Sequence, residues 1–414
     1  MTELLIGTAK EITNRLAECE EAIAQIADVP LSAKLINQFR KQFGQDLADV
    51  LLSVAALQSK AKKKFAVNDA NRIWWATDKS LQQATAWQVA KLKSAWLGDR
   101  TVYDLCCGVG GDAMQLANRG PVVAIDADPV LAAMAGANLA RSPSVDDCQA
   151  RCADATTVDV PADAAVHIDP DRRSPNARSS QPELYQPDWH QVMRVIQRVE
   201  SAIIKVAPVA NLDSLQIQRD ASGDTHRCWI SLRGSVREQA LLVGESVALA
   251  GLPAGGTSAA IVAGDGSAVR FLSNDTAQPP LLAQQPMEFM VDPDASIRAA
   301  GLTESFATKH NLHLLGSAAG FLTCDNDIRS IEKLAIVGRV IWMGAFDDRK
   351  LRREFRDRNI YPQTIKTRGT GHDPASFTKR FRQCGETPVT LWLGRSGARV
   401  FAAITEDMRN QPGD

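Results

Sequence analysis

The stretch DLCCGVGGD, residues 104–112, decides the fold of this chain. The residues before it, Thr101 to Tyr103, are β-branched or aromatic and are typical of a short buried strand. Three glycines then fall within four positions, and a mostly apolar run follows to Ala117, which indicates a glycine-rich turn leading into a helix. The backbone N–H groups of such a turn and helix start are suited to bind a phosphate or a carboxylate.

A second expected strand ends in Asp126, 18 positions after Gly108. A doubly wound sheet places an acidic side chain there to accept hydrogen bonds from ribose hydroxyls, so the pattern predicts a ligand with a ribose. The spacing from Gly108 through Gly110 to Ala113 also satisfies the dinucleotide fingerprint, and the glycines alone leave NAD open. Asp104 favours S-adenosylmethionine (SAM), because a carboxylate at the end of the first strand can meet an ammonium group, which NAD lacks.

The same residues resemble the motifs of a known enzyme family. Residues 104–111 are similar to motif I of the class I SAM-dependent methyltransferases, and residues 125–129 are similar to their motif II. An acidic residue after a third strand, here expected at 148–153, accepts the exocyclic amine of adenine in that family. The resemblance implies an α/β, Rossmann-like sheet with SAM as the cofactor. The residues that it places around SAM are Asp104, Cys106, Gly108, Gly110, Gly111, Asp126, Ala127 and Asp154.

A further match lies where the fourth expected strand, residues 164–168, runs into the sequence DPDR at 169–172. This position should face the ligand crevice at the carboxyl ends of the strands. It resembles motif IV, the Asp-Pro-Pro-aromatic signature of enzymes that methylate amino nitrogens. A carboxylate and a carbonyl that accept the two N–H bonds of an aromatic amine localise its lone pair on nitrogen and aim it at the methyl sulfonium, without a metal.

The match assigns Asp169 and the carbonyl of Pro170 to orienting the acceptor. Asp171 and Arg172 replace the second proline and the aromatic residue of the signature, which leaves open whether the acceptor is a base amine. Arg172 is expected to stack on a base or to pair with a phosphate. Lys205, in the fifth expected strand, is expected to hold a phosphate or to pair with Asp169.

Three nearby side chains have two interpretations each. Tyr185 and Trp189 are expected either to supply the aromatic face that the motif lacks or to pack in the core. His167 lies inside the fourth strand, where a core histidine is the more common role than a catalytic base.

Residues 1–98 are expected to form a helical N-terminal domain, because apolar side chains recur there at helical spacing. Its last helix is expected to be capped by Thr77 or Asp78 and to run to about Trp96.

Residues 81–85 resemble a segment that precedes motif I in some RNA-modifying methyltransferases, where it helps to cover the methionine end of the cofactor. This resemblance assigns Gln83 and Thr85 to the cofactor site. An ordinary exposed helix face is the alternative.

Beyond the expected methyltransferase domain, residues 99–275, the segment 274–286 is rich in Pro, Gln and small residues and is expected to be a linker. Residues 287–414 resemble the C-terminal α+β module, ferredoxin-like or THUMP-like, of a bacterial family of RNA methyltransferases. Residues 331–414 carry 16 Lys and Arg against 10 Asp and Glu, an excess of +6 in a chain whose net charge is −1. This asymmetry suits contact with an RNA backbone, and a solvated helix face explains it equally well.

The composition, 45% hydrophobic and 23% charged over 414 residues, is that of a globular protein with a large core. No apolar run of 18 residues and no leader are present, so a cytoplasmic protein without a membrane segment is expected. The eight cysteines have no Cys-x-x-Cys spacing, and no metal site is expected. The oligomeric state is left open.

The function expected from these features is SAM-dependent methylation of a base, with an amino nitrogen favoured, in structured RNA such as tRNA or rRNA. The alternatives are a methyltransferase that acts on a small molecule or a protein, and a non-catalytic RNA-binding protein with a relic SAM fold.

Overall fold

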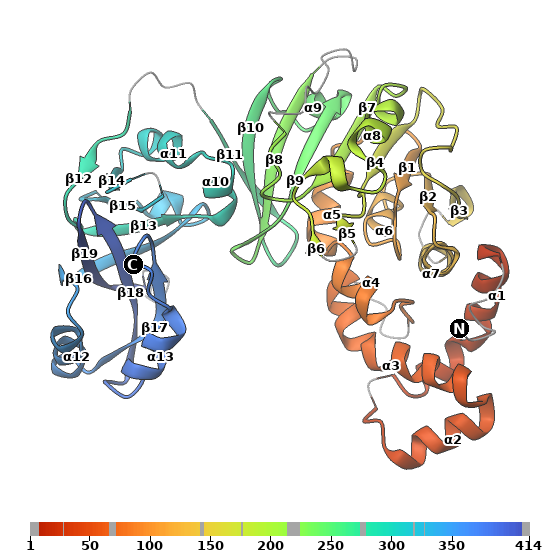
Figure 1. The fold of residues 1–414 in the computed structure, drawn as a ribbon, viewed down its shortest axis with the longest axis horizontal. Helices are drawn as coiled ribbons and strands as arrows, with labels where there is room; N and C mark the ends of the chain where they lie inside the picture. The colour runs from red at the N-terminus through yellow and green to blue at the C-terminus, as the bar shows by residue number, and fades with distance from the viewer. Residues whose placement is uncertain are drawn as a thin grey trace. The chain divides into compact units, whose positions relative to one another are not determined.

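The computed structural model describes residues 8–27, 29–65, 72–140, 145–174, 177–212, 224–273, 279–317, 319–326 and 328–407. The chain divides into two compact units (Figure 1). The first contains residues 1–232, 237–256 and 262–268, and the second contains residues 233–236, 257–261 and 269–414. The three domain ranges expected from the sequence stay a prediction.

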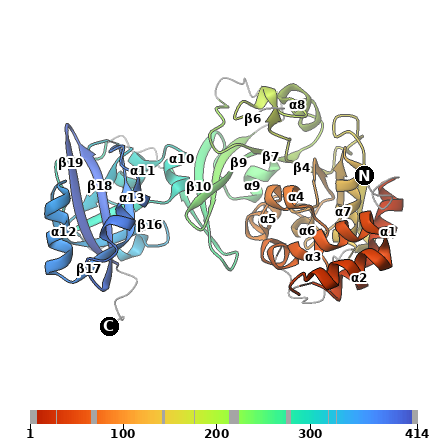
Figure 2. The same cartoon turned by 60° about the horizontal axis from the view of Figure 1, so that its bottom comes forward.

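The first unit begins with helices, whose bounds are α1 (Ala9–Ala24), α2 (Ala33–Phe43), α3 (Gln45–Phe65), α4 (Asp78–Gln83) and α5 (Trp87–Ser94). A positive φ of 78° at Gly44 separates α2 from α3. Helix α1 packs against α7 (Pro129–Leu139) at one edge of the sheet (Figure 2). The Thr13 hydroxyl donates to the Ala133 carbonyl at 3.1 Å.

One helix differs from the expectation. Thr77 caps α4, since its hydroxyl accepts from the amide of Ser80 at 3.1 Å. The expected continuous helix to about Trp96 is wrong, because the backbone turns extended at Ala84 (ψ 144°) and α5 starts anew at Trp87. The residues at this break contact the functional site described below.

The sheet formed mainly by the first unit has the order β11-β10-β8-β9-β7-β4-β1-β2-β3, and most residues of β10 and β11 belong to the second unit. Strands β3, β2, β1, β4 and β7 are parallel, and β9 is antiparallel to β7. The bounds are β1 (Val102–Leu105), β2 (Val122–Asp126), β3 (Cys148–Cys152), β4 (Ala165–Ile168), β7 (Ser201–Val206), β8 (Thr225–Leu232), β9 (Ser235–Gly244), β10 (Gly256–Val262) and β11 (Ala268–Leu272).

Strand β1 is fully buried and lies between β2 and β4, so the chain leaves it first toward one edge of the sheet and then returns to its other side. Such a reversal opens a crevice at the carboxyl ends of the central strands. The glycine-rich turn after β1 leads into α6 (Ala113–Leu116), and α7 follows β2. The strand, turn and helix expected around residues 104–112 and the α/β, Rossmann-like sheet are therefore confirmed.

The remaining elements of the first unit connect the strands. They are β5 (Arg173–Ser174), β6 (Ala177–Arg178), the short 3-10 helices η2 (Val145–Asp147) and η3 (Pro182–Leu184), and helices α8 (Trp189–Ile196) and α9 (Glu245–Leu249). Strands β5 and β6 pair with each other and follow the DPDR sequence at 169–172.

The second unit holds an eight-stranded sheet of order β12-β14-β15-β13-β16-β19-β18-β17. Its strands are β12 (Leu282–Ala283), β13 (Phe289–Pro293), β14 (His313–Leu315), β15 (Phe321–Cys324), β16 (Ala335–Ala345), β17 (Ile360–Thr367), β18 (Thr387–Ser396) and β19 (Arg399–Asp407). Its helices are α10 (Ala295–Ala299), α11 (Thr303–Lys309), the short η4 (Arg329–Ile331), α12 (Asp348–Asp357) and α13 (Pro374–Phe381).

Part of the expected linker, residues 274–278, lies outside the described residues. Its later part contains β12, which pairs with β14 of the second unit. Among the described residues, no helix is both long and apolar enough to cross a membrane.

Candidate functional site

The turn after β1, residues 106–111, is called the glycine turn below. Cys106, Gly108 and Gly110 have positive φ angles of 59°, 59° and 84°. A Cβ at Gly108 would meet no described atom within 4 Å, so the backbone conformation, and not crowding, favours glycine there. A Cβ at Gly111 would lie 3.1 Å from the amide nitrogen of Thr85, so this glycine lets the break between α4 and α5 approach the turn.

Asp126, at the end of β2, is fixed against the glycine turn. The amide of Gly108 donates to its Oδ2 at 2.8 Å, and the amide of Asp128 donates to its Oδ1 at 2.9 Å. Burial raises the pKa of Asp126, and the two N–H donors oppose part of that shift. Ala127 is exposed beside it. The structure therefore brings together the two motifs that the sequence predicts to hold the ribose.

Asp154 follows β3, the strand next to β2. Its Oδ1 accepts from the amide and the hydroxyl of Thr156, both at 2.8 Å, and these hydrogen bonds lower its pKa. The amide of Ala153 donates to the carbonyl of Asp126 at 3.0 Å, which places the ends of the two strands side by side.

Asp104 lies near the end of β1 and is 1% exposed. Its Oδ1 is 2.7 Å from Nδ1 of His167 on the adjacent strand β4, while its Oδ2 has no hydrogen-bond partner among the described residues. Burial raises the pKa of Asp104 against the opposing effect of His167. A buried carboxylate oxygen without a donor is unfavourable, which marks it as a candidate ligand contact.

The Cys106 thiol lies at the start of the glycine turn, and the charges of several expected site residues act on it. Burial raises its pKa well above the usual value, and the carboxylates of Asp126, Asp169, Asp104 and Asp154 raise it further. These are the four carboxylates that the sequence assigns to the cofactor and to the acceptor. They lie in or just after four neighbouring strands of the sheet, in the order β4, β1, β2 and β3.

Asp169 and Lys205 form an ion pair. The Nζ of Lys205 lies 2.5 Å from Oδ2 of Asp169 and donates to the hydroxyl of Thr85 at 3.0 Å. Burial lowers the pKa of Lys205, but Asp169 and then Glu238 outweigh that effect, and the net shift is upward. Of the two roles left open for Lys205, the structure shows the pairing with Asp169.

The remaining residues expected near the site are Arg172, Gln83, Pro170 and Tyr185. Arg172 is half-buried and its carbonyl accepts from the amide of Ser179 at 2.7 Å, while Gln83 is half-buried at the end of α4. Pro170 is buried. Tyr185 is buried in the core of the unit, and its hydroxyl accepts from the amide of Ala207 at 3.2 Å.

Trp189 is also buried in that core, 4% exposed. Core packing is therefore the role that the structure shows for the two aromatic residues, and neither takes the place of the aromatic residue missing from the DPDR sequence.

Sequence reasoning missed a set of buried charges behind these residues. Nζ of Lys93, on α5, is 2.8 Å from Oδ1 of Asp112, 2.7 Å from Oε1 of Glu238 and 3.0 Å from Nε2 of His167. Lys93 and Glu238 are each 1% exposed. Asp112 ends the glycine-rich stretch and was visible in the sequence, but nothing in the pattern links it to a lysine on an earlier helix or to a glutamate on β9.

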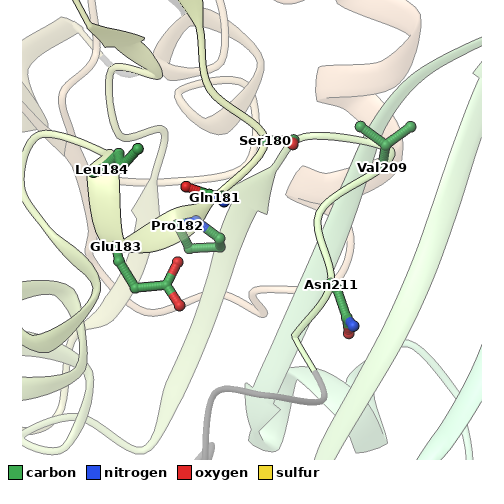
Figure 3. A pocket seen from close by; sticks show the side chains of 7 residues that line it. All are labelled: Ser180, Gln181, Pro182, Glu183, Leu184, Val209 and Asn211. Carbon is green, nitrogen blue, oxygen red and sulfur yellow. The ribbon is translucent and has the colours of Figure 1, made fainter.

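A pocket of about 380 Å³ lies in the first unit (Figure 3). Its lining comes from the segment around η3 and from the loop after β7, as Figure 3 shows. Leu184 and Val209 at its rim are 53% and 78% exposed. The lining residues are Ser180, Gln181, Pro182, Glu183, Leu184, Val209 and Asn211.

No protein-family model matches the chain. A search of curated proteins finds an uncharacterized S-adenosylmethionine-dependent methyltransferase of Mycobacterium tuberculosis, present in two strains and 30% identical over 373 residues. The match covers 88% of this chain and 98% of the relative. Among solved structures, a protein of Porphyromonas gingivalis described as a candidate methyltransferase superposes with a TM-score of 0.72 at 14% identity, over 94% of this chain and 98% of its own. That structure shows the fold, and the curated relative shows the family: the chain belongs to the S-adenosylmethionine-dependent methyltransferases.

Proposed function

We propose that this protein transfers the methyl group of SAM to an amino nitrogen of a base in structured RNA, such as tRNA or rRNA. The observation that carries the proposal is that the expected cofactor side and the expected acceptor side flank the end of β1: the amide of Gly108 donates to Asp126 at 2.8 Å, and the amide of Asp169 donates to the carbonyl of Leu105 at 3.2 Å. The family membership supports the cofactor and the reaction.

The residues on the cofactor side fit the parts of SAM. Asp126 would accept hydrogen bonds from the ribose hydroxyls, and Asp154 from the adenine amine. The open face of the glycine turn at Gly108 suits close approach of a ligand to the backbone. The unpartnered Oδ2 of Asp104 suits the ammonium of the amino-acid part. Cys106 and Ala127 would lie beside the bound cofactor.

When bound, SAM supplies an electrophilic methyl group on a sulfonium. Asp169 and the carbonyl of Pro170 would accept the two N–H bonds of the acceptor amine and aim its lone pair. Lys205 is paired with Oδ2 of Asp169. The other oxygen, Oδ1, would accept the N–H of the acceptor amine and would take up the proton that the amine loses after methylation. The hydroxyl of Thr85 accepts a hydrogen bond from Lys205. The break between α4 and α5, which the sequence did not predict, therefore helps to hold the lysine that pairs with Asp169.

A basic surface on the second unit supports RNA as the acceptor. Helices α12 and α13 lie side by side, since Nη1 of Arg380 is 2.9 Å from Oδ1 of Asp348 and the rings of Phe355 and Phe381 are 5.2 Å apart. The phenylalanines are fully buried, so they pack in the core and do not stack on bases. The exposed basic side chains of the two helices are Arg349, Lys350, Arg353, Arg356, Lys379 and Arg380. Such a surface suits contact with phosphates.

Two other basic residues of this region have a different role. Nζ of Lys366 is 2.8 Å from Oδ2 of the buried Asp292, and Nη2 of Arg368 is 3.2 Å from its Oδ1. These cations are held inside the second unit by a carboxylate. We therefore assign the proposed RNA contact to α12 and α13.

The test is incubation of the protein with heavy-methyl SAM and total RNA, followed by nucleoside mass spectrometry. One new labelled nucleoside with the methyl group on an exocyclic nitrogen is expected, and Asp169→Asn should abolish it while SAM binding persists. Label found only in protein or in small molecules would instead support another acceptor. Absence of SAM binding by calorimetry would support a relic fold.

A further inference from the structure

The buried charges behind the site form a connected set, called the Lys93 cluster, that consists of Lys93, Asp112, Glu238, His167 and Asp104. The members come from five separate places in the first unit: α5, the end of the glycine-rich stretch, β9, β4 and β1. Each member is at most 7% exposed. Its contacts run from Glu238 and Asp112 to Lys93, from Lys93 to His167, and from His167 to Asp104.

The chemistry of the partners fixes the tautomer of His167. Burial lowers the pKa of Lys93, but Asp112 and then Glu238 outweigh burial, and the net shift is strongly upward, so Lys93 is an ammonium. An ammonium only donates, so Nε2 of His167, 3.0 Å away, is the acceptor. The ring hydrogen therefore lies on Nδ1, which donates to Oδ1 of Asp104 at 2.7 Å.

In this arrangement one carboxylate oxygen of Asp104 accepts a hydrogen bond from His167, and the other is available to a ligand. Oδ1 is occupied by His167, and Oδ2 is buried with no hydrogen-bond partner among the described residues. The Lys93 cluster also contains three carboxyl groups and one lysine. Lys205, 3.8 Å from Glu238, is itself paired with Asp169. A buried excess of carboxylate favours an additional cation next to Asp104.

We propose that Lys93 and His167 are positioning residues, which orient Asp104 so that its Oδ2 receives the ammonium of the amino-acid part of the cofactor. Lys93 fixes the tautomer of His167, and His167 fixes the rotamer of Asp104. Asp112 and Glu238 hold Lys93 in place. The inference rests on the proposed cofactor site and adds to it the residues that set its specificity for an amino acid.

Two substitutions at His167 separate its two contacts. The amide nitrogen of Asn can take the place of Nδ1, so His167→Asn keeps a donor toward Asp104. The amide of Gln reaches the place of Nε2, so His167→Gln keeps the contact with Lys93 and loses the donor toward Asp104. His190→Gln, an exposed histidine on α8, is the matched control.

The probes are S-adenosylhomocysteine, which carries the amino-acid part, and methylthioadenosine, which lacks it; both are uncharged at sulfur. Calorimetry should show that His167→Gln weakens binding of S-adenosylhomocysteine by about 10-fold and changes methylthioadenosine binding by less than about 2-fold. His167→Asn should stay within about 3-fold of the unmodified protein for both probes, as should His190→Gln.

A separate measurement needs no substitution. In a nitrogen spectrum of protein with labelled histidine, His167 should show a protonated Nδ1 and an unprotonated Nε2, and its Nδ1 signal should move when S-adenosylhomocysteine is added. The opposite tautomer, or an equal loss of both probes in His167→Gln, would overturn the proposal. Failure of the unmodified protein to bind either probe would count against the proposed function itself, which is a distinguishable result.

Discussion

Replacing Lys93 with Met should destabilise the first unit strongly. The lysine side chain is 1% exposed and has three polar atoms within 3.0 Å, from Asp112, Glu238 and His167. Met fills a similar volume, so the loss is one of charge and not of packing. Asp112 and Glu238 would be left as buried carboxylates without their main counter-charge.

The size of the effect follows from these contacts. Removing one partner of a buried ion pair costs about 3–5 kcal/mol, because the other charge stays buried. Lys205 lies 3.8 Å from Glu238 and offsets part of that cost, so we expect the lower end, about 3 kcal/mol. At about 2–4 °C per kcal/mol for a unit of this size, the melting temperature should fall by roughly 6–12 °C.

The assay is urea unfolding, followed by tryptophan fluorescence and by calorimetry so that the transitions of the two units are separated. Lys91→Met, on the same helix but exposed, is the control and should change stability by less than about 0.5 kcal/mol. Adding Glu238→Gln to Lys93→Met should recover stability, because it removes an unpaired buried charge. If Lys93→Met unfolded at the same urea concentration as Lys91→Met, the reasoning from buried charge would be refuted.

Three further outcomes test the site and the basic surface. Asp126→Ala should weaken SAM binding by about 10- to 100-fold, or about 1.5–3 kcal/mol, and unchanged affinity by calorimetry would remove the ribose assignment. Burial raises the pKa of Asp104 in the empty site, and the ligand's ammonium favours the carboxylate, so binding should release a proton. Affinity for S-adenosylhomocysteine should therefore rise with pH above the usual range of an aspartate and below the range where the ligand's amino group titrates. Methylthioadenosine should show no such rise, and a flat profile for both ligands would contradict the role of Asp104. Arg353→Ala and Lys379→Ala should each reduce the salt dependence of RNA binding by about one unit in log–log slope, whereas an unchanged slope in filter-binding titrations would exclude α12 and α13 as the phosphate contact.

Local sequence was sufficient to predict the glycine turn and the place of Asp126 at the end of the next strand, but not the hydrogen bond between them. A strand, three glycines and a helix start constrain one another within a dozen residues, and the next strand must then pair beside the first. In the structure the amide of Gly108 donates to the carboxylate of Asp126. The place of Asp104 at the end of β1 follows from the same short-range logic.

The helix break between α4 and α5 could not be predicted in this way. The residues from Leu81 to Ala84 favour a helix, and no glycine or proline interrupts them. The break is set by contacts from elsewhere, the approach of Gly111 to the Thr85 backbone and the hydrogen bond from Lys205 to the Thr85 hydroxyl. Tertiary contacts override local preference at such a point, and a single sequence does not display them.

The Lys93 cluster was hidden for a related reason. Its members, such as Lys93 and Glu238, are far apart in the sequence although they are in contact in the structure. The strand that carries the glutamate, β9, was also not among the strands expected by residue range. A lysine on an amphipathic helix and a glutamate in a strand are ordinary surface residues when taken singly. Only the sheet order, in which β9 inserts next to β7, makes them buried partners.

The insertion of β9 between β7 and β8 has a consequence for how the chain matures on the ribosome. Lys93 and Lys205 are synthesised well before Glu238, so a nascent chain that ends before β9 lacks a carboxylate that lies near both lysines. It also leaves one side of β7 as an open edge, which invites pairing with other chains. We therefore expect that the core of the first unit closes late, once residue 244 has left the exit tunnel.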